Sequence, residues 1–191
     1  MGVWDEIAEQ WSKFRRKPIP ELEEFHRKYV SKPGKILDIG CGNCRNLLPF
    51  GFKGYELYGI DKSAKMIEQA QLFTSEYNLK VSLEVGDMVS LPYPDNFFDY
   101  VLSLAALHHL RTPARRKRAV QEMYRVLKRG GIARVSVWQE LHKEESFVKW
   151  GELKRYYYKF PPKELRRLLE ATGFNVLESY VGRNLIFVVQ K

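Results

Sequence analysis

Between residues 35 and 137, short apolar runs alternate with longer amphipathic stretches, and this alternation limits the folds open to the chain more than any other feature. Two apolar runs of strand length that are joined by an amphipathic helix form parallel strands, with the helix covering one face of the sheet. The predicted strands are residues 35–39, 56–60, 81–85, 98–104 and 132–137, and the predicted crossover helices include residues 63–77 and 116–127. We therefore expect an α/β fold with helices on both faces of a mostly parallel sheet.

The carboxy-terminal part of the chain breaks the alternation. A helix is expected from Pro161 and Pro162 to Gly173, and two strand patterns follow at residues 174–181 and 185–189. The link between these two strands is too short for a parallel crossover, so they must form an antiparallel hairpin. The patterns together predict a Rossmann-like, seven-stranded, mostly parallel sheet with a C-terminal antiparallel hairpin.

The amino-terminal part precedes the first predicted strand. Residues 4–13 and 20–29 have the periodicity of two short amphipathic helices. This divides the chain into an N-terminal helical segment, residues 1–30, and an α/β domain, residues 31–191. A length of 191 residues suits one compact domain overall, because a chain of this size buries most of its apolar surface on folding.

The formal net charge of +9 is unevenly distributed. From Lys13 to Lys35 there are eight Lys or Arg residues against three Glu, and from Arg111 to Arg129 there are eight against one. Such clusters attract polyanions, although a solvated surface of the thermophile type is the alternative. The chain has no apolar run near the roughly 20 residues that cross a bilayer, and no signal-peptide pattern, so we expect a cytoplasmic protein with no membrane partner.

Cys41 and Cys44 are the only cysteines, and their CxxC spacing suggests either a redox pair or half of a zinc site. A zinc site needs further ligands, and the chain has neither a second cysteine pair nor a suitably spaced histidine pair. Both cysteines also fall inside a glycine turn that has another explanation. We therefore expect no metal site.

Asp38 precedes Gly40 and Gly42 at the end of the first predicted strand, where open α/β sheets bind ligands, and this glycine turn is expected to open the next helix. Glycine at these positions lets the backbone approach a bound molecule closely. A dinucleotide fingerprint needs a further glycine three residues after Gly42, where this chain has Arg45. A carboxylate before the first glycine suits a positively charged ligand, such as the ammonium and sulfonium groups of S-adenosyl-L-methionine.

Two more acids follow the next two predicted strands. Asp61 is placed to accept hydrogen bonds from both hydroxyls of a ribose. Asp87 is placed to accept from an adenine amino group, and Met88 to pack on the adenine ring. The alternatives are helix N-capping for Asp38 and Asp61 and a turn role for Asp87.

These segments, together with residues 91–99 and 127–131, resemble class I S-adenosylmethionine-dependent methyltransferases over nearly the whole chain. The resemblance implies that S-adenosyl-L-methionine is the cofactor and S-adenosyl-L-homocysteine the product. It implies a cofactor site that comprises Asp38, Gly40, Gly42, Asp61, Asp87, Met88, Ser103, Leu104 and Ala105. The segment of residues 103–105 is expected beside the methionine part of the cofactor, and Cys44 stands where many members carry a third glycine.

His108 and His109 follow the fourth predicted strand at the expected mouth of the substrate site. Because the sulfonium methyl group is already activated, the protein must chiefly align the acceptor and remove its water. The two histidines are candidates for proton transfer from an oxygen or nitrogen acceptor. The alternative is that they only shape the loop.

Shorter motifs outside the cofactor segments are similar to the wobble-uridine tRNA methyltransferase family, which esterifies the carboxylate of 5-carboxymethyluridine at the first anticodon position. They are Ile7-Ala8, Trp11-Ser12, Arg115-Arg116, Val137-Trp138 and residues 15–18, 105–110, 155–160 and 182–184. The resemblance implies that tRNA is the substrate and that the amino-terminal helical segment folds over the cofactor as a lid.

A carboxylate acceptor is its own nucleophile at neutral pH, so it needs a cationic clamp rather than a base. Arg15 matches the family's arginine in the amino-terminal segment and is the candidate clamp, with an exposed phosphate contact as the alternative. Tyr156 and Tyr157 are candidates for stacking on an extruded base, with core packing as the alternative. Arg115 and Arg116 are expected to contact tRNA phosphates or else to form a solvated helix face.

The third predicted strand, Val81–Val85, should lie at the edge of the sheet with an unpaired hydrogen-bonding ladder. The family resemblance implies a small zinc-binding activator protein at this edge. A small-molecule methyltransferase of the quinone-biosynthesis type is the main rival interpretation, and the basic clusters count against it. A non-catalytic RNA-binding or partner-binding scaffold is the other rival, and the intact acids at the cofactor positions count against that.

Overall fold

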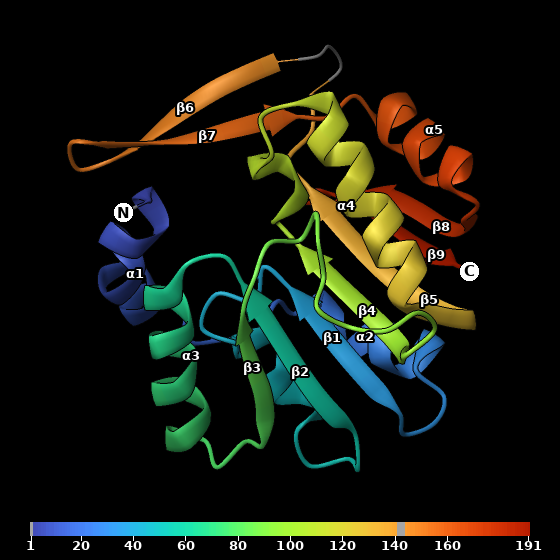
Figure 1. Cartoon of the computed structure of the whole chain (residues 1–191), viewed down its shortest axis with the longest axis horizontal. Helices are drawn as coiled ribbons and strands as arrows, with labels where there is room; N and C mark the ends of the chain where they lie inside the picture. The colour runs from blue at the N-terminus through green and yellow to red at the C-terminus, as the bar shows by residue number, and fades with distance from the viewer. Residues whose placement is uncertain (1, 141–143) are drawn as a thin grey trace.

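The computed structural model describes residues 2–140 and 144–191, and a central sheet runs through the molecule (Figure 1). Its seven strands have the order β3-β2-β1-β4-β5-β9-β8. Their bounds are Lys35–Ile39 for β1, Glu56–Asp61 for β2, Val81–Val85 for β3, Phe98–Leu104 for β4, Leu127–Val137 for β5, Asn175–Val181 for β8 and Leu185–Gln190 for β9. Strands β1 to β5 are parallel, whereas β9 is antiparallel to both β5 and β8. The predicted seven-stranded sheet with its C-terminal antiparallel hairpin is confirmed, and so is the edge position of β3.

Strand β1 lies at the centre of the parallel part of the sheet. Its register with β2 and β4 places Asp38 beside Gly59 and Leu102. Strand β3 pairs with β2, so that Val85 lies beside Asp61. Because parallel strands end at the same edge of a sheet, the residues that follow these strands converge there.

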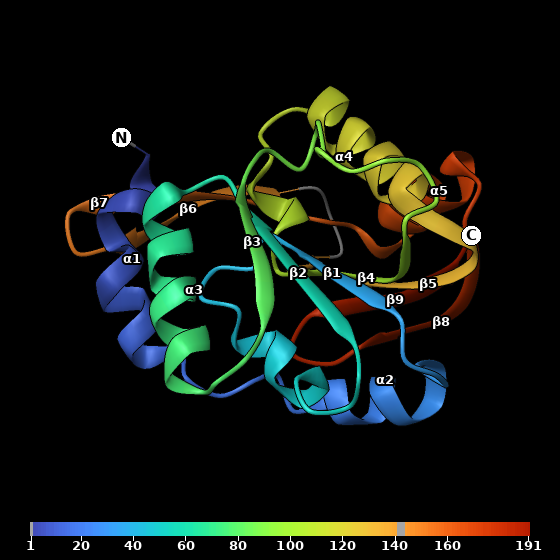
Figure 2. The same ribbon diagram turned by 60° about the horizontal axis from the view of Figure 1, so that its bottom comes forward.

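Helices cover both faces of the sheet (Figure 2). One face carries α4 (Pro113–Val126) and α5 (Pro162–Thr172), whose buried side chains join one core cluster. The other face carries α2 (Glu21–Tyr29), the 3-10 helix η1 (Arg45–Phe50) and α3 (Ala64–Glu76), which join a second cluster. Within the part of the chain that the structure describes, no helix combines the length and the apolar character that a membrane crossing requires.

The two amino-terminal helices occupy different places. Helix α2 packs into the core through its buried Leu22 and Phe25. Helix α1 (Val3–Phe14) instead packs on α3, and its Asp5 carboxylate accepts a 2.7 Å hydrogen bond from the Ser63 hydroxyl at the start of α3. Helix α1 is therefore held at the surface by α3, whereas α2 is part of the core.

A second sheet has two strands, β6 (Glu144–Trp150) and β7 (Leu153–Lys159). This hairpin reaches toward α1 (Figure 1), where Trp150 Nε1 donates a 2.6 Å hydrogen bond to Gln10 Oε1. The sequence pattern did not predict the hairpin, since charged residues interrupt the apolar alternation of β6.

The segment after β1 also differs from the expectation. The sequence predicts that the glycine turn opens a helix, and the turn opens the six-residue 3-10 helix η1 rather than a full α-helix. Pro49 lies inside η1, and a proline there lacks the N–H donor and would clash with a carbonyl of the preceding turn in an α-helix. The glycine loop is therefore followed by a short, tight helix.

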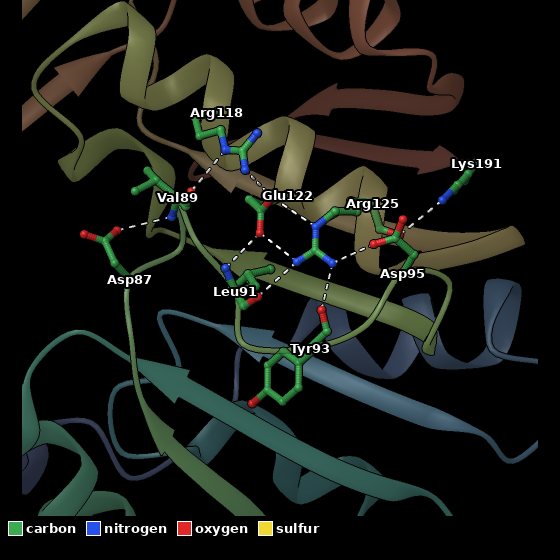
Figure 3. Close-up of polar contacts among 9 residues, drawn as sticks. All are labelled: Asp87, Val89, Leu91, Tyr93, Asp95, Arg118, Glu122, Arg125 and Lys191. Carbon is green, nitrogen blue, oxygen red and sulfur yellow. Dashed lines mark hydrogen bonds and ion pairs between the residues drawn. The ribbon is translucent and has the colours of Figure 1, made fainter.

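The loop between β3 and β4, which carries Asp87, is held against α4 by a largely buried ion pair (Figure 3). The Glu122 side chain, which is 3% exposed, accepts a 2.8 Å hydrogen bond from the Leu91 N–H and pairs with Arg125 at 2.8 Å. Arg125 also donates to the carbonyls of Leu91 and Tyr93, at 3.0 Å and 2.7 Å. The carboxylate of this ion pair thus holds a backbone N–H of the loop, and the guanidinium holds two of its backbone carbonyls.

We predict that Arg125→Ala lowers the free energy of unfolding by about 3 kcal/mol, because it leaves the Glu122 carboxylate buried without its main partner. Equilibrium urea denaturation measures the loss. The control Lys13→Ala removes an exposed ion pair with Glu9 and should cost far less stability. Equal losses in the two variants would contradict this role of Arg125.

Candidate active site

A pocket of about 370 Å³ lies at the carboxyl edge of the sheet. Residues that follow β1, β2, β3 and β4 line it, together with side chains of α1. The lining residues that the sequence predicted as site residues are Gly40, Gly42, Asp61, Asp87, Met88, Leu104, Ala105, His109 and Arg115. Separate strand ends therefore bring most of the predicted site together.

The glycine loop after β1 forms one wall of the pocket. Gly40 has a φ angle of +71° and Gly42 one of +55°, a left-handed conformation that glycine adopts at little cost. A Cβ on Gly40 would lie 2.5 Å from the Ala106 Cβ, and a Cβ on Gly42 would lie 3.1 Å from the Trp11 ring. Gly40 therefore leaves no room for a side chain, whereas a side chain on Gly42 would require the Trp11 ring to shift slightly.

The two cysteines of this loop serve in packing. Both are buried and free, and a Cβ on Gly59 of β2 would lie 2.8 Å from Cys44 Sγ and 3.1 Å from Cys41 Sγ. The hydrogen bond with Cys44, together with burial, raises the pKa of the Cys41 thiol well above its usual value. A protonated, enclosed thiol is a poor nucleophile, so the pair fills the space between the loop and the sheet. Cys44 itself has a φ of +64°, the conformation that a glycine would take with less strain.

Asp61 joins the glycine loop to the start of α3. Its Oδ2 accepts a 2.9 Å hydrogen bond from the Gly42 N–H, and its Oδ1 accepts one of 3.0 Å from the Ser63 N–H. Burial raises the pKa of Asp61, and these backbone hydrogen bonds act in the opposite direction. Asp61 lines the pocket, and each carboxylate oxygen keeps a second lone pair, so both can also accept from a ribose diol.

Asp38 is 1% exposed, and neither of its carboxylate oxygens has a hydrogen-bond partner among the described residues. Burial raises the pKa of Asp38 to about 7, with the charge of Arg45 acting against this shift and that of Asp61 adding to it. Asp38 does not line the pocket itself but precedes the glycine loop that does. Burying an acid without a partner costs free energy, and a cationic ligand group nearby would offset that cost.

Asp87 lines the pocket, and its carboxylate is shared by two cations. Its Oδ2 accepts from Lys62 Nζ at 2.9 Å and from Arg115 Nη2 at 2.6 Å. Burial acts to raise the pKa of Asp87, but the hydrogen bonds from Lys62 and Arg115 outweigh it and hold the pKa below its usual value. Arg115 therefore links the start of α4 to this wall of the pocket.

The turn after β4 forms a further wall. Leu104 and Ala105 line the pocket, whereas Ser103 is 1% exposed and does not. Ala105 has a φ of +56°, a strained conformation for a residue with a Cβ, and its N–H donates to the Ser136 carbonyl at 2.9 Å. Strain of this kind is concentrated at ligand-binding positions.

His108 and His109 lie in the 3-10 helix η2 (Leu107–His109) that follows this turn. His108 is fully buried, and its Nδ1 accepts a 2.9 Å hydrogen bond from the Trp138 N–H, which puts its proton on Nε2. His109 lines the pocket, and its Nδ1 donates to the Tyr156 carbonyl at 2.9 Å, which leaves Nε2 as an acceptor. Burial lowers the pKa of His108 well below its usual value and that of His109 to about 4, so both rings are neutral at pH 7.

Four of the predicted substrate residues lie outside the pocket lining, namely Arg15, Arg116, Tyr156 and Tyr157. Arg15 is exposed just after the end of α1. Tyr156 and Tyr157 are buried, and Tyr157 stacks on Trp138 with ring centroids 4.0 Å apart. For the tyrosines the structure agrees with the alternative interpretation, core packing.

Arg116 requires a correction. The expected contact with tRNA phosphates is wrong for this structure, because Arg116 is only 2% exposed. Its guanidinium lies 3.6 Å from the centroid of the Tyr158 ring and donates to the carbonyls of Leu110 and Arg111 at 2.9 Å and 3.1 Å. One face of α4 is turned to the core, and one residue of its basic run falls on that face.

Trp4 and Trp11 of α1 line the pocket, although the sequence did not mark them as site residues. Trp4 packs edge-on against His109, with ring centroids 4.8 Å apart. A signal was available, since Trp4, Ile7, Ala8 and Trp11 follow the spacing of one helical face. That face of α1 closes one side of the pocket.

These features fit S-adenosyl-L-methionine. The glycine loop allows close approach, Asp61 offers acceptors for a ribose diol and Met88 offers an apolar surface for adenine. The unpartnered charge of Asp38 suits a cationic amino-acid part and would repel a pyrophosphate. Fold and site together define an S-adenosylmethionine-dependent methyltransferase.

Comparison with known proteins extends this assignment. Residues 37–135 match the family model of a methyltransferase domain. The tRNA (carboxymethyluridine(34)-5-O)-methyltransferase of Schizosaccharomyces pombe is 31% identical over 224 residues, which cover 98% of this chain and 93% of that protein. The chain belongs to the methyltransferase family of which this tRNA methyltransferase is a member.

Solved structures show the same fold. A protein from Pyrococcus horikoshii OT3 superposes with a TM-score of 0.79 at 23% identity, over 95% of this chain and 91% of that chain. A chain from the complex between the Trm112 methyltransferase activator and a methyltransferase of Haloferax volcanii gives a TM-score of 0.78 at 20% identity, over 100% of this chain and 98% of that chain. At these identities the likeness establishes the fold alone.

We predict that Asp38→Asn stabilises the ligand-free protein at pH 8 and that this advantage shrinks as the pH falls to 5. The pKa of Asp38 rises from an ordinary 3.8 to about 7 on folding, so the folded protein holds this proton more tightly than the unfolded chain does. The free energy of unfolding therefore falls as the pH rises through this window and recovers on acidification. Urea denaturation of both proteins at the two pH values measures the difference. Glu68→Gln, at an exposed ion pair, is the control and should show no such trend. An Asp38→Asn effect that is the same at both pH values would contradict the buried, unpartnered state of Asp38.

Proposed function

We propose that the protein transfers a methyl group from S-adenosyl-L-methionine to the carboxylate of 5-carboxymethyluridine at the wobble position of tRNA, which forms a methyl ester. The observation that carries this proposal is the similarity to the Schizosaccharomyces pombe enzyme, which extends over nearly the whole length of both chains. The neutral histidine at the pocket and the basic surface around it support the same substrate.

A carboxylate acceptor suits the state of His109. With its pKa lowered to about 4, this histidine is a weak base at neutral pH. A carboxylate already carries its negative charge, so its oxygen bonds to the methyl carbon without losing a proton. The site must then orient the acceptor and exclude water, and the pocket walls formed by Trp4, Trp11 and Leu104 are apolar.

The lid is assigned to α1. Trp4 and Trp11 of this helix line the pocket, and Asp5 fastens the helix to Ser63 at the start of α3. Helix α1 also packs its buried Ile7 and Ala8 on Met66 of α3, in a small apolar cluster that is separate from the two larger core clusters. Departure of α1 from the pocket would expose this small cluster and leave the two larger ones in place.

Basic side chains near the pocket suit a polyanionic substrate. Arg15 and Lys17 are exposed after α1, Arg111 is exposed and lines the pocket, and Lys117 and Arg118 are exposed on α4. We assign these residues to tRNA phosphates. Arg15 fits a phosphate contact better than a carboxylate clamp, because it lies outside the pocket lining.

The decisive experiment supplies methyl-labelled S-adenosyl-L-methionine together with tRNA from a strain that lacks this enzyme. We predict label in carboxymethyluridine at the wobble position, and its release as methanol under mild alkali, as an ester requires. Asp61→Asn should reduce labelling by about tenfold or more, because it weakens hydrogen bonds to the cofactor ribose. Label in a lipid extract with none in tRNA would contradict the proposal and favour a quinone-type methyltransferase.

We also propose that a small zinc-binding activator protein docks on edge strand β3. Strand β3 pairs with β2 on one side only, and Val85 near its end is 49% exposed. An edge strand with a free ladder and an exposed apolar side chain can accept a further strand. The fold likeness to a chain from a complex with the Trm112 activator supports this partner.

We predict that Val85→Arg weakens co-purification with a co-expressed Trm112-type activator. The matched control is Leu177→Arg, since Leu177 is 40% exposed on β8 at the opposite edge of the sheet. Loss of the complex in the β8 variant but not in the β3 variant would contradict docking at β3.

A further inference from the structure

Arg155 of β7 is a buried cation beside the pocket. It is 9% exposed, and aromatic rings surround its guanidinium. The guanidinium carbon lies 5.6 Å from the ring centroid of Trp4, 5.1 Å from that of Trp150 and 5.4 Å from that of Tyr157. These rings come from α1, β6 and β7, so the enclosure is formed where the hairpin meets the amino-terminal helix.

The guanidinium of Arg155 forms no ion pair and donates no hydrogen bond within residues 2–140 and 144–191, and its buried Nε has no partner. The other buried arginines of this fold differ. Arg116 donates to the carbonyls of Leu110 and Arg111, and Arg134 donates to the carbonyl of Glu21. Arg155 alone of these three has ring faces around its guanidinium and no hydrogen-bond partner among the described residues.

Ring faces compensate only part of the cost of burying a cation. A cation–π contact attracts the charge but satisfies none of the guanidinium N–H donors, which water satisfies when the side chain is exposed. Buried charges in proteins are usually paired, and an unpaired cation beside a pocket is a candidate site for an anion. A planar guanidinium with free N–H groups matches a carboxylate in particular, because the two groups can form parallel hydrogen bonds.

Arg155 adjoins the wall of the pocket that Trp4 and His109 form. Trp4 and His109 both line the pocket. Trp4 packs on Arg155. Tyr157 packs on Arg155 and also on His109, and the ring centroids of Tyr157 and His109 lie 4.6 Å apart. A displacement of the Trp4 ring would therefore open the guanidinium to the pocket.

We propose that Arg155, and not Arg15, binds the carboxylate that accepts the methyl group; this rests on the proposed function. One carboxylate oxygen attacks the methyl carbon while the other is held by the guanidinium. The new bond is C–O, the bond that breaks is S–CH3, and the electron pair of the broken bond stays on sulfur. The anionic acceptor and the cationic sulfonium become a neutral ester and a neutral thioether, and no proton moves.

The inference is tested with two anticodon stem-loop RNAs that differ only in the C5 substituent of the wobble uridine, carboxymethyl in one and carbamoylmethyl in the other. Their affinities are measured by fluorescence titration of the protein with S-adenosyl-L-homocysteine bound. The wild type should bind the carboxylate RNA about tenfold or more tightly, as a hydrogen bond to a charged group implies. Arg155→Met should remove this preference and leave the affinity for the amide RNA within about threefold.

Arg15→Met is the matched control. As an exposed phosphate contact, Arg15 should support both RNAs equally, so this variant weakens both and keeps the preference. Arg155→Lys, which keeps the charge but not the planar fork, should retain only part of the preference. Binding of S-adenosyl-L-homocysteine verifies that each variant is folded.

Thermal unfolding adds a readout that separates binding from a structural role. Removing an uncompensated buried charge should leave the melting temperature of Arg155→Met unchanged or raised, whereas Arg116→Met should lower it, because Arg116 satisfies two carbonyls. An Arg155→Met variant that keeps the carboxylate preference while the wild type forms the ester in tRNA would overturn this inference alone. A wild type that forms no ester in tRNA would overturn the proposed function and the inference with it.

Discussion

The carboxylate of Asp61 connects the parts on which the site depends. It accepts hydrogen bonds from the glycine loop through Gly42 and from the start of α3 through Ser63. Ser63 in turn donates to Asp5 of α1, so the glycine loop, α3 and α1 are joined in one short chain of polar contacts. This chain exists because β1 and β2 are parallel neighbours, whose carboxyl ends open on the same edge of the sheet.

The ionisable groups at and beside the pocket are buried or lack partners, and this disfavours their usual charge states. Asp38 is buried without a partner, and burial raises its pKa to about 7. Burial keeps His109 neutral, and Arg155 is enclosed by aromatic rings. Each arrangement costs stability in the ligand-free protein, and a cationic cofactor with an anionic acceptor would offset the costs at Asp38 and Arg155. Such a site distinguishes its ligands by charge as well as by shape.

Much of the fold and of the cofactor site could be predicted from the sequence, because both depend on local patterns. Apolar runs and their connections determine the sheet, and Asp61 ends one strand while Asp87 lies two residues after the next, so their place at the pocket follows from topology. The rest depends on tertiary packing. Arg116 stands in an apparently solvated basic run, and only the packing of α4 shows which face is buried. The β6–β7 hairpin, which encloses Arg155, has no apolar alternation in β6 to reveal it.

The most direct test of the cofactor site is a calorimetric titration of the wild type and of Asp61→Asn with S-adenosyl-L-homocysteine. We expect the wild type to bind one molecule and the variant to bind about tenfold or more weakly, since a neutral amide cannot accept as strongly from both the ribose and the backbone. No binding by the wild type, or equal binding by both proteins, would contradict the assignment of this pocket to the cofactor.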